Sequence, residues 1–299
     1  MQTGIPDTSP SVVELLTTLR AERFSLRAWR QFLSNSWIMS RTIARDNPQL
    51  TRSWLRLTIL LCMLTLFILA AISSSEGIPT MLRMLPGLVI CLAWQQSDLF
   101  WHLSLNRDPQ TGELRQELGI ANMLTALRGL AASILIARLV AGLSTSSHLA
   151  LTVFVAGILS DILDGEIARR TDTRSRLGQI MDGEVDATLY LVLALVLIQN
   201  GRMPGWVGLV LLLRYLVPIL GALGSYLLFA RPVRFGSTPT GKCAGILQSL
   251  YFLALLLPHN RLFLIQVIAM PLLVLTIMLL IAAVSMQIIT NVRRGAGAW

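Results

Sequence analysis

The sequence is poor in charged residues, in acidic residues and in cysteine. Only 14% of its 299 residues are charged, and its 16 Asp and Glu are outnumbered by 25 Lys and Arg. With 54% hydrophobic residues and a mean hydropathy of +0.65, this composition excludes an ordinary soluble domain. The three cysteines, Cys62, Cys91 and Cys243, suggest no disulfide framework and no Cys/His zinc site, so we predict three free thiols.

Long hydrophobic runs dominate the chain instead. A run of about 18 apolar residues or more can cross a hydrocarbon core of roughly 30 Å. The predicted spans cover residues 54–75, 84–101, 122–143, 148–168, 179–199, 206–229, 243–257 and 263–290. The second is the weakest, because Pro86 and the polar group at 95–98 interrupt it. We therefore predict an all-α polytopic membrane helix bundle, and we expect no secretory signal peptide.

Basic residues outside the spans are distributed asymmetrically. The N-terminal segment and alternate loops carry most of them, whereas the intervening loops carry only Arg83, Arg202 and Arg261. This positive-inside pattern places both termini and the loop at 169–178 in the cytoplasm. The net charge of +9 is therefore explained mainly by topology, and we expect no nucleic-acid partner.

The chain divides into four predicted regions. Residues 1–53 form a cytoplasmic basic amphipathic segment, 54–101 two extra transmembrane helices, 102–120 a polar cytoplasmic loop, and 121–292 a six-helix membrane domain. Residues 11–45 mix hydrophobic side chains with arginines, which suits a basic amphipathic helix lying on anionic lipid. A helix docked on the protein itself explains the same pattern equally well.

One stretch, "DILDGEIARRTDTRSRLGQIMDGEVD" at 161–186, holds seven of the 16 acidic residues. Asp161 and Asp164 are spaced i, i+3, and Asp182 and Asp186 are spaced i, i+4, so each pair projects from one helix face. An antiparallel hairpin that turns near 170–177 would bring all four to a similar depth, a short way inside the cytoplasmic boundary. We predict that the four carboxylates form one cluster.

Four clustered carboxylates repel one another and need a compensating positive charge. Neighbouring arginines are one candidate, namely Arg169, Arg170, Arg174 and Arg176. These arginines lie in or beside the loop, whereas the aspartates lie deeper. Divalent metal bound through hard oxygen ligands, Mg²⁺ or Mn²⁺, fits better. We assign no role to His102, His148 or His259, which are distant in sequence.

The acidic stretch reads D-x2-D-G-x2-A-R-x8-G-x3-D-x3-D, which resembles the motif of the CDP-alcohol phosphotransferase family. The resemblance covers about residues 118–292. It implies two metal ions held by Asp161, Asp164, Asp182 and Asp186, with Asp186 also serving as the general base. It further implies a nucleotide-binding set of Gly165, Ala168, Arg169 and Gly178. The small residues in this set are also compatible with close helix packing alone.

A second fragment, "ANMLTALRG" at 121–129, resembles the family's first core helix. The resemblance implies that Asn122, Thr125 and Arg128 lie near the nucleotide end. Asn122 can also be explained as an ordinary helix N-cap.

Two observations leave the acceptor open. "GKCAGILQ" at 241–248 resembles the G-K-x-x-T-x-x-Q pattern of the phosphatidylglycerophosphate synthases and implies an acceptor contact for Lys242, but Gly245 takes the Thr position. Ala187 stands where many family members have Lys or Arg. Arg214 is a second acceptor-binding candidate, because a cation within a span usually faces a partner or a cavity.

The expected activity is transfer of a phosphatidyl group from a CDP-linked lipid, CDP-diacylglycerol above all, to a small alcohol, with release of CMP at the cytoplasmic side. The expected partners are these substrates and membrane lipids, and a homodimer is left open. A cation transporter or channel is the main alternative. Against it, the helices continue beyond the aspartates into the apolar runs "LTVFVAGIL" and "ATLYLVLALVL". An inactive scaffold of the same fold is a further alternative.

Overall fold

The computed structural model describes residues 17–108, 110–171, 173–213, 216, 220, 239–257, 267, 269–279, 281, 282 and 285. Among these residues the regular elements are helices, and the only extended pairing is an isolated bridge between Arg107 and Leu114. The prediction of an all-α helix bundle is confirmed.

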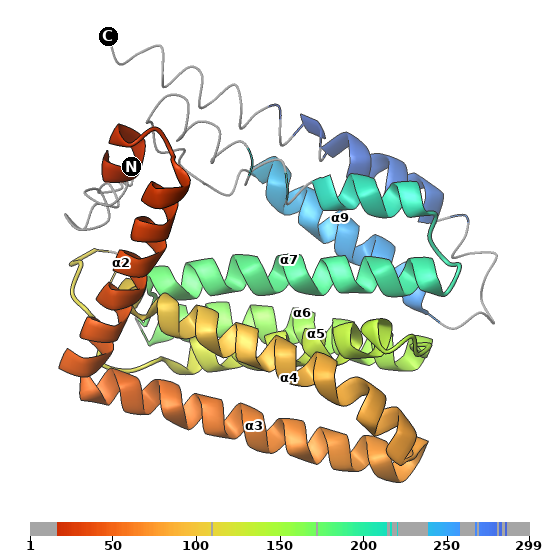
Figure 1. Cartoon of the computed structure of the whole chain (residues 1–299). Helices are drawn as coiled ribbons and strands as arrows, with labels where there is room; N and C mark the ends of the chain where they lie inside the picture. Colours follow the sequence, from red (N-terminus) through yellow and green to blue (C-terminus); the bar gives the residue numbers. More distant parts are fainter. Residues whose placement is uncertain are drawn as a thin grey trace. The chain divides into compact units, whose positions relative to one another are not determined.

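The helices follow the predicted spans closely (Figure 1). In chain order they are α2 (Leu26–Asp46), α3 (Pro48–Glu76), α4 (Ile78–Trp101), the 3₁₀ turn η1 (Leu103–Leu105), α5 (Ile120–Val140), α6 (Ser147–Arg170), α7 (Arg176–Gln199) and α9 (Pro239–Leu256). By length and composition, α3, α4 and α5 could each cross a membrane. The predicted spans 206–229 and 263–290 lie partly outside the described residues, which include helical segments at 205–213 and 269–279.

The chain forms two compact units. Unit 1 comprises Met1–Ala141 and Gly157–Asp186, and unit 2 comprises Gly142–Ala156 and Ala187–Trp299. Helices α6 and α7 contribute residues to both units. All four motif aspartates belong to unit 1.

Helix α3 contributes one buried stripe to unit 1. The stripe repeats every three or four residues and consists of Leu50, Ser53, Leu57, Leu61, Thr65, Leu69 and Ile72. Outside it, Met63, Leu66 and Phe67 are largely exposed, although they are apolar. A helix that is apolar all round, with only one side buried by protein, is typical of a membrane span.

Helix α4 is continuous through Pro86 and packs closely on α5. A Cβ atom at Gly87 would lie 3.0 Å from the Cα of Ala137. A Cβ atom at Gly129 would lie 2.4 Å from Nε2 of Gln95, which donates a hydrogen bond of 2.8 Å to the Ala126 carbonyl. Glycine on each helix therefore permits an approach that a larger residue would prevent.

Helix α2 crosses the ends of α3 and α4 (Figure 1). It ends at Asp46, and α3 begins at Pro48, a residue that helices accept at their first position. One side of α2 is docked, because Ser40 Oγ donates to the Trp101 carbonyl at 2.5 Å and Trp101 Nε1 donates to Ser36 Oγ at 2.7 Å.

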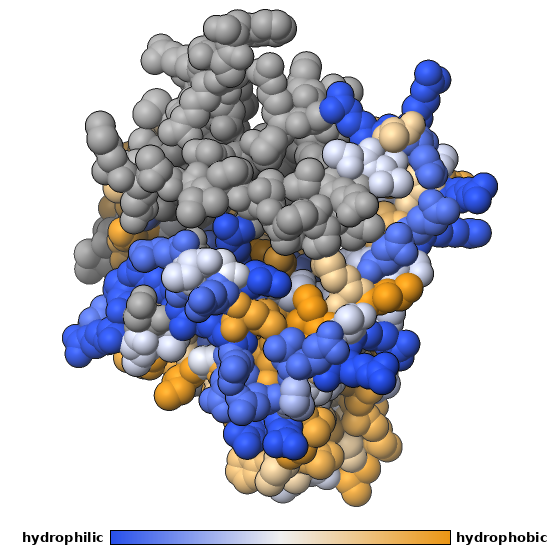
Figure 2. Space-filling view, turned by 90° about the vertical axis from the view of Figure 1, so that its left-hand side faces the viewer, coloured by the Kyte–Doolittle hydropathy of each residue, from blue (hydrophilic) through white to orange (hydrophobic). Residues whose placement is uncertain are grey.

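The other side of α2 leaves four arginines exposed, namely Arg27, Arg30, Arg41 and Arg45. Figure 2 shows hydrophilic residues gathered over this end of the molecule. Docking on the protein thus accounts for one side of α2, and contact of the other side with anionic lipid stays a prediction.

The segment between α4 and α5 contains a tight turn. Asp108 accepts hydrogen bonds from the backbone N–H groups of Gln110 and Thr111 at 2.7 and 3.1 Å, and Gly112 has a φ of +74°. These backbone hydrogen bonds lower the pKa of the partly exposed Asp108 carboxyl. The turn is therefore built from local interactions.

Unit 2 has an aromatic centre. Phe154, Tyr190 and Phe252 lie within 6.1 Å of one another by ring centroids, and the Tyr190 hydroxyl shares a hydrogen bond with Ser249. The three cysteines of the chain are free, as predicted.

Candidate active site

Three helices of unit 1 bring the four motif aspartates around one arginine. Arg128 comes from α5, Asp161 and Asp164 come from α6, and Asp182 and Asp186 come from α7. Arg128 Nη1 lies 3.0 Å from Asp161 Oδ1 and 3.4 Å from Asp164 Oδ2. Its Nη2 lies 3.4 Å from both Asp182 Oδ1 and Asp186 Oδ1. One terminal nitrogen of the guanidinium thus contacts the α6 pair, and the other contacts the α7 pair.

The arginine lies behind the carboxylates. The Arg128 side chain is 0% exposed and that of Asp164 is 4% exposed. Asp161, Asp182 and Asp186 have side chains exposed by 52%, 42% and 35%. Carboxylate oxygens are therefore accessible from outside, whereas the compensating charge is not.

Thr125 connects the two aspartate pairs one turn before Arg128. Its Oγ1 lies 2.7 Å from Asp182 Oδ1 and 3.2 Å from Asp164 Oδ2, and 3.1 Å from the Ala121 carbonyl of its own helix. A hydroxyl has a single proton to donate, so these acceptors share it. Thr125 thereby holds an α6 carboxylate beside an α7 carboxylate.

An open pocket of about 260 Å³ adjoins the cluster within unit 1. Its walls are Ala121, Asn122, Thr125, Asp164, Gly165, Ala168, Arg169, Thr173, Arg174, Ser175, Gly178, Gln179 and Asp182. Six residues with an expected nucleotide-binding role are in this set, namely Asn122, Thr125, Gly165, Ala168, Arg169 and Gly178. Arg128, Asp161 and Asp186 are not part of the wall.

The two motif glycines have different surroundings. A Cβ atom at Gly178 would lie 2.7 Å from Asn122 Oδ1, so this glycine permits close packing of α7 on α5. A Cβ atom at Gly165 would have only Arg169 Nη1 near it, at 3.5 Å. Packing therefore accounts for Gly178, whereas Gly165 leaves free space at the pocket wall.

The interpretation of Asn122 as an N-cap is wrong. The N-cap of α5 is Gly119, and Asn122 lies within the first turn, with its amide against Gly178. Helix α5 begins at Ile120, two residues before the predicted span at 122–143.

Two of the four arginines next to the aspartates pair with another carboxylate. Arg169 and Arg170 form ion pairs of 2.7 and 2.6 Å with Glu166, one turn away on α6. The cation among the aspartates is instead Arg128, for which the family resemblance implies a position near the nucleotide end. Its position inside a predicted span was the available signal, because an intramembrane cation needs a partner.

The donor chemistry of the cluster fits a hard divalent cation. Its ligands would be carboxylate oxygens, which Mg²⁺ and Mn²⁺ prefer. Within the part of the chain that the structure describes, no three His, Cys, Asp or Glu side chains are arranged as a finished metal cage. The carboxylates converge on the guanidinium instead, and two of them, Asp164 and Asp182, border the open pocket.

Unit 2 contains the residues with an expected acceptor role. Lys242 is exposed near the start of α9, and Arg214 lies outside the described residues. Their contact with an acceptor stays a prediction.

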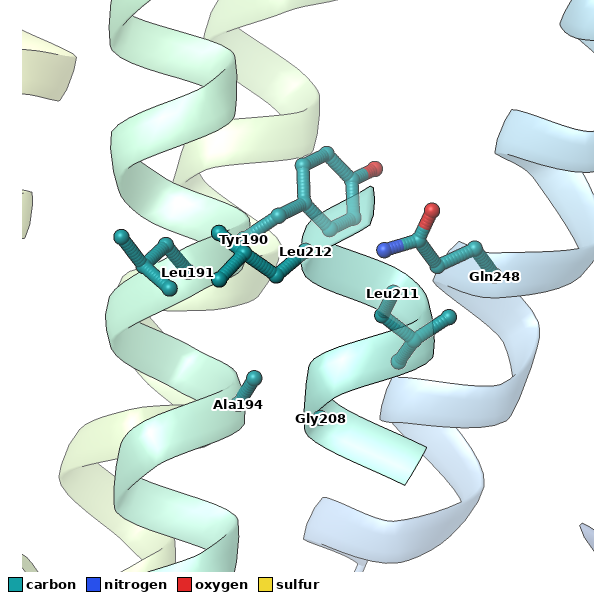
Figure 3. Close-up of a pocket in the computed structure, with 7 residues that line it drawn as sticks. All are labelled: Tyr190, Leu191, Ala194, Gly208, Leu211, Leu212 and Gln248. Carbon is teal, nitrogen blue, oxygen red and sulfur yellow. The ribbon is translucent and has the colours of Figure 1, made fainter. Parts of the chain in front are cut away.

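A second cavity lies within unit 2 and is shown in Figure 3. It measures only about 10 Å³ and lies between α7, the helical segment 205–213 and α9. Gln248 is buried and points its amide toward the space between Tyr190 and Leu211 (Figure 3). A cavity of this size holds about one water molecule, so a nucleotide cannot enter it.

Comparison with known proteins identifies one family. The model of the CDP-alcohol phosphatidyltransferase family matches residues 118–287, more than half of the chain. The matched region includes α5, α6, α7 and α9, and helices α2 to α4 precede it. No curated protein and no solved structure matches the chain. The resemblance seen in the acidic motif is thereby confirmed.

Proposed function

Because the chain belongs to the CDP-alcohol phosphatidyltransferase family, a membrane transferase family, we propose that it transfers a phosphatidyl group from CDP-diacylglycerol to a small alcohol. CMP is the second product. The observation that carries the proposal is the convergence of four aspartates beside an open pocket in unit 1. The positive-inside pattern supports an active site facing the cytoplasm.

Two divalent ions are the proposed cofactors, and the residues that would hold them are Asp161, Asp164, Asp182 and Asp186. When bound, such ions neutralise charge on the diphosphate and orient its oxygens. Members of the family generally depend on a divalent metal, which supports this assignment. The oxygen-only chemistry of the cluster supports it independently.

The nucleotide end of the donor is proposed to lie in the pocket next to Asp164 and Asp182. Gly165 supports this placement, because a Cβ atom there would meet little. Ala168 has a short side chain and so leaves room in the pocket, and Arg169 adds a guanidinium to the pocket lining. A flat base can approach such a wall closely, and a cation near it suits a phosphate.

Asp186 is the proposed general base. Its side chain is 35% exposed, so an acceptor hydroxyl can approach it. In the proposed step the hydroxyl oxygen forms a bond to the phosphorus that carries the lipid, the bond from that phosphorus to the CMP oxygen breaks, and the hydroxyl proton passes to Asp186. Lys242 and Arg214 are the candidates for binding an anionic acceptor.

The test uses the purified full-length chain in lipid nanodiscs with CDP-diacylglycerol, Mg²⁺ and a panel of acceptors that includes glycerol phosphate, inositol phosphate and serine. We expect CMP and one new phospholipid, both identified by mass spectrometry, and no CMP after verified metal removal with EDTA. Full CMP release without metal would overturn the metal assignment. Absence of CMP with every acceptor, together with metal flux into liposomes, would favour a cation transporter instead.

A further inference from the structure

Arg128 differs from the other arginines near the aspartates in its burial and in the number of carboxylates it contacts. Its side chain is 0% exposed, and both terminal nitrogens lie within 3.4 Å of carboxylate oxygens. Its Nε is buried without a hydrogen-bond partner among the described residues. The guanidinium is therefore held by the four carboxylates alone.

The fork geometry matters as well as the charge. The two terminal nitrogens are divided between helices, with Nη1 at the α6 pair and Nη2 at the α7 pair. A lysine ammonium is a single point charge and cannot reproduce that division. Arg128 therefore links three helices at the level of the candidate site.

Carboxylates bind a metal in their ionised form, so as metal ligands the four carboxylates and one guanidinium would carry a formal charge of −3. Two divalent ions added to this cluster would leave an excess positive charge beside a buried cation. A bound diphosphate brings negative charge to the same place and removes that excess. Without the guanidinium, two divalent ions would match four carboxylates by themselves.

From this geometry we infer that Arg128 is an internal counter-cation, a positioning residue that holds the metal-free carboxylates together and makes divalent-metal binding depend on the CDP diphosphate. The inference rests on the proposed function, since it takes a CDP diphosphate as the second ligand. Metal and diphosphate should then bind with positive coupling, and coupling between two ligands is reciprocal. Couplings between sites typically amount to about 5- to 150-fold in affinity.

The experiment measures Mn²⁺ binding to the full-length chain in nanodiscs by the EPR signal of free Mn²⁺, with and without CDP as the probe. For the unsubstituted protein we expect CDP to raise the Mn²⁺ affinity by about tenfold or more. For Arg128→Gln we expect tighter Mn²⁺ binding without CDP and little further gain from CDP. Its unfolding midpoint should fall in EDTA and recover with Mn²⁺. Arg128→Lys, which keeps the charge and loses the fork, should keep most of the CDP effect and unfold earlier in EDTA.

Arg138→Gln is the matched control. Arg138 lies on the same helix and is nearly as buried, but it pairs with Glu76, far from the aspartates along α5. We expect this variant to leave the Mn²⁺ affinity unchanged and to lose equal stability with and without Mn²⁺.

A CDP-independent Mn²⁺ affinity in the unsubstituted protein would overturn the inference, and this measurement needs no variant to fold. An Arg128→Gln protein with unaltered Mn²⁺ affinity would overturn it too. Neither measurement requires turnover. A chain that couples Mn²⁺ to CDP but releases no CMP would support the inference and contradict the proposed function, whereas a chain that releases CMP without such coupling would do the reverse.

Discussion

Two arginines on α5 differ in the number of carboxylates that they contact. Arg138, near the end of the helix, pairs with the carboxylate of Glu76 at 2.7 Å. Arg128, about three turns earlier, contacts four carboxylates at 3.0 to 3.4 Å. Both side chains are buried to 90% or more, so burial does not distinguish them.

Charge balance does distinguish them. The Arg138 pair is formally neutral, and it joins the end of α5 to the end of α3. Arg83 strengthens the same end of the bundle by donating to the Ala141 carbonyl at 2.7 Å. In the Arg128 cluster one guanidinium faces four carboxylates, so an added cation can be accommodated there without leaving a buried charge unpaired. Several accessible carboxylates around one buried cation are therefore the better indicator of a ligand site, and a balanced pair indicates a structural link.

Removing one carboxylate from each arginine gives the largest expected contrast. Asp186→Asn keeps the size of the side chain but cannot accept a proton as a carboxylate does, so turnover should fall by about 10²- to 10⁴-fold. Glu76→Gln should leave turnover within about twofold. The measurement is the initial rate of CMP release with the identified acceptor. A near-normal rate for Asp186→Asn would show that the base is another residue.

A substitution beside Arg138 should affect stability and spare catalysis. At Gly87 a new Cβ atom would lie 3.0 Å from the backbone of Ala137, which cannot move aside as a side chain can. Gly87→Ala should therefore lower the free energy of unfolding by about 1–3 kcal/mol. Gly183→Ala is the control, because a Cβ atom there meets nothing within 4 Å. Equal unfolding midpoints for the two variants in denaturant titration would contradict the close α4–α5 contact.

A double-mutant cycle should give a smaller effect at the balanced pair. Glu76 has a side chain that is 39% exposed, so solvent screens its interaction with Arg138. We expect a coupling free energy of about 0.2–1 kcal/mol between Glu76→Gln and Arg138→Gln. The cycle compares the unfolding free energies of both single variants and the double variant. A coupling several times larger would mean that this pair is not simply a link between helix ends.

The smallest expected effect concerns His102, just after α4. Its hydrogen bond to the side chain of Asp98 is the main cause that raises the pKa of His102 above 6.5, and the charge of Glu184 acts in the same direction. A raised pKa in the folded protein stabilises it below pH 6.5, and this stabilisation is lost as the pH rises through the folded value.

For this partly exposed pair we expect only a few tenths of a kcal/mol. Unfolding midpoints measured from pH 5.5 to 8.5 should therefore fall slightly more for the unsubstituted protein than for His102→Gln. Parallel curves would show that Asp98 does not stabilise the charged imidazole.

The helices and the aspartates could be predicted from the sequence because both are local signals. An apolar run specifies a span by its own composition, and the i, i+3 and i, i+4 spacings specify a shared face. Pro86 and the polar group at 95–98 weakened one prediction, yet α4 is continuous. There the polar residues have tertiary partners, since Gln95 donates to the Ala126 carbonyl and Gln96 accepts from Thr58.

The position of Arg128 in a span predicts that it has a partner, but which carboxylates it contacts could not be predicted, because that depends on how α5 is rotated against α6 and α7. Sequence spacing shows that Thr125 and Arg128 are close on one helix, but it does not show which neighbour they face. The close contact of Gly129 with Gln95 has the same origin. Each contact depends on how two helices pack against each other, so the residues of one helix alone do not predict it.

The partners of the two α5 arginines are synthesised at different times, because the chain is made from its N-terminus. An arginine in the middle of a membrane helix costs about 2.5–3.5 kcal/mol to insert, and Arg128 lies about 12 Å along α5 from Ile120. Glu76, the partner of Arg138, leaves the ribosome before α5 does, whereas all four partners of Arg128 follow later in α6 and α7. We therefore expect the newly made α5 to enter the bilayer with Arg128 unpaired, and we expect α4, through the contact of Gln95 with Gly129, to help hold it there until α6 and α7 are made. A nascent chain that stops after α5 should accordingly insert less completely than one that continues through α7.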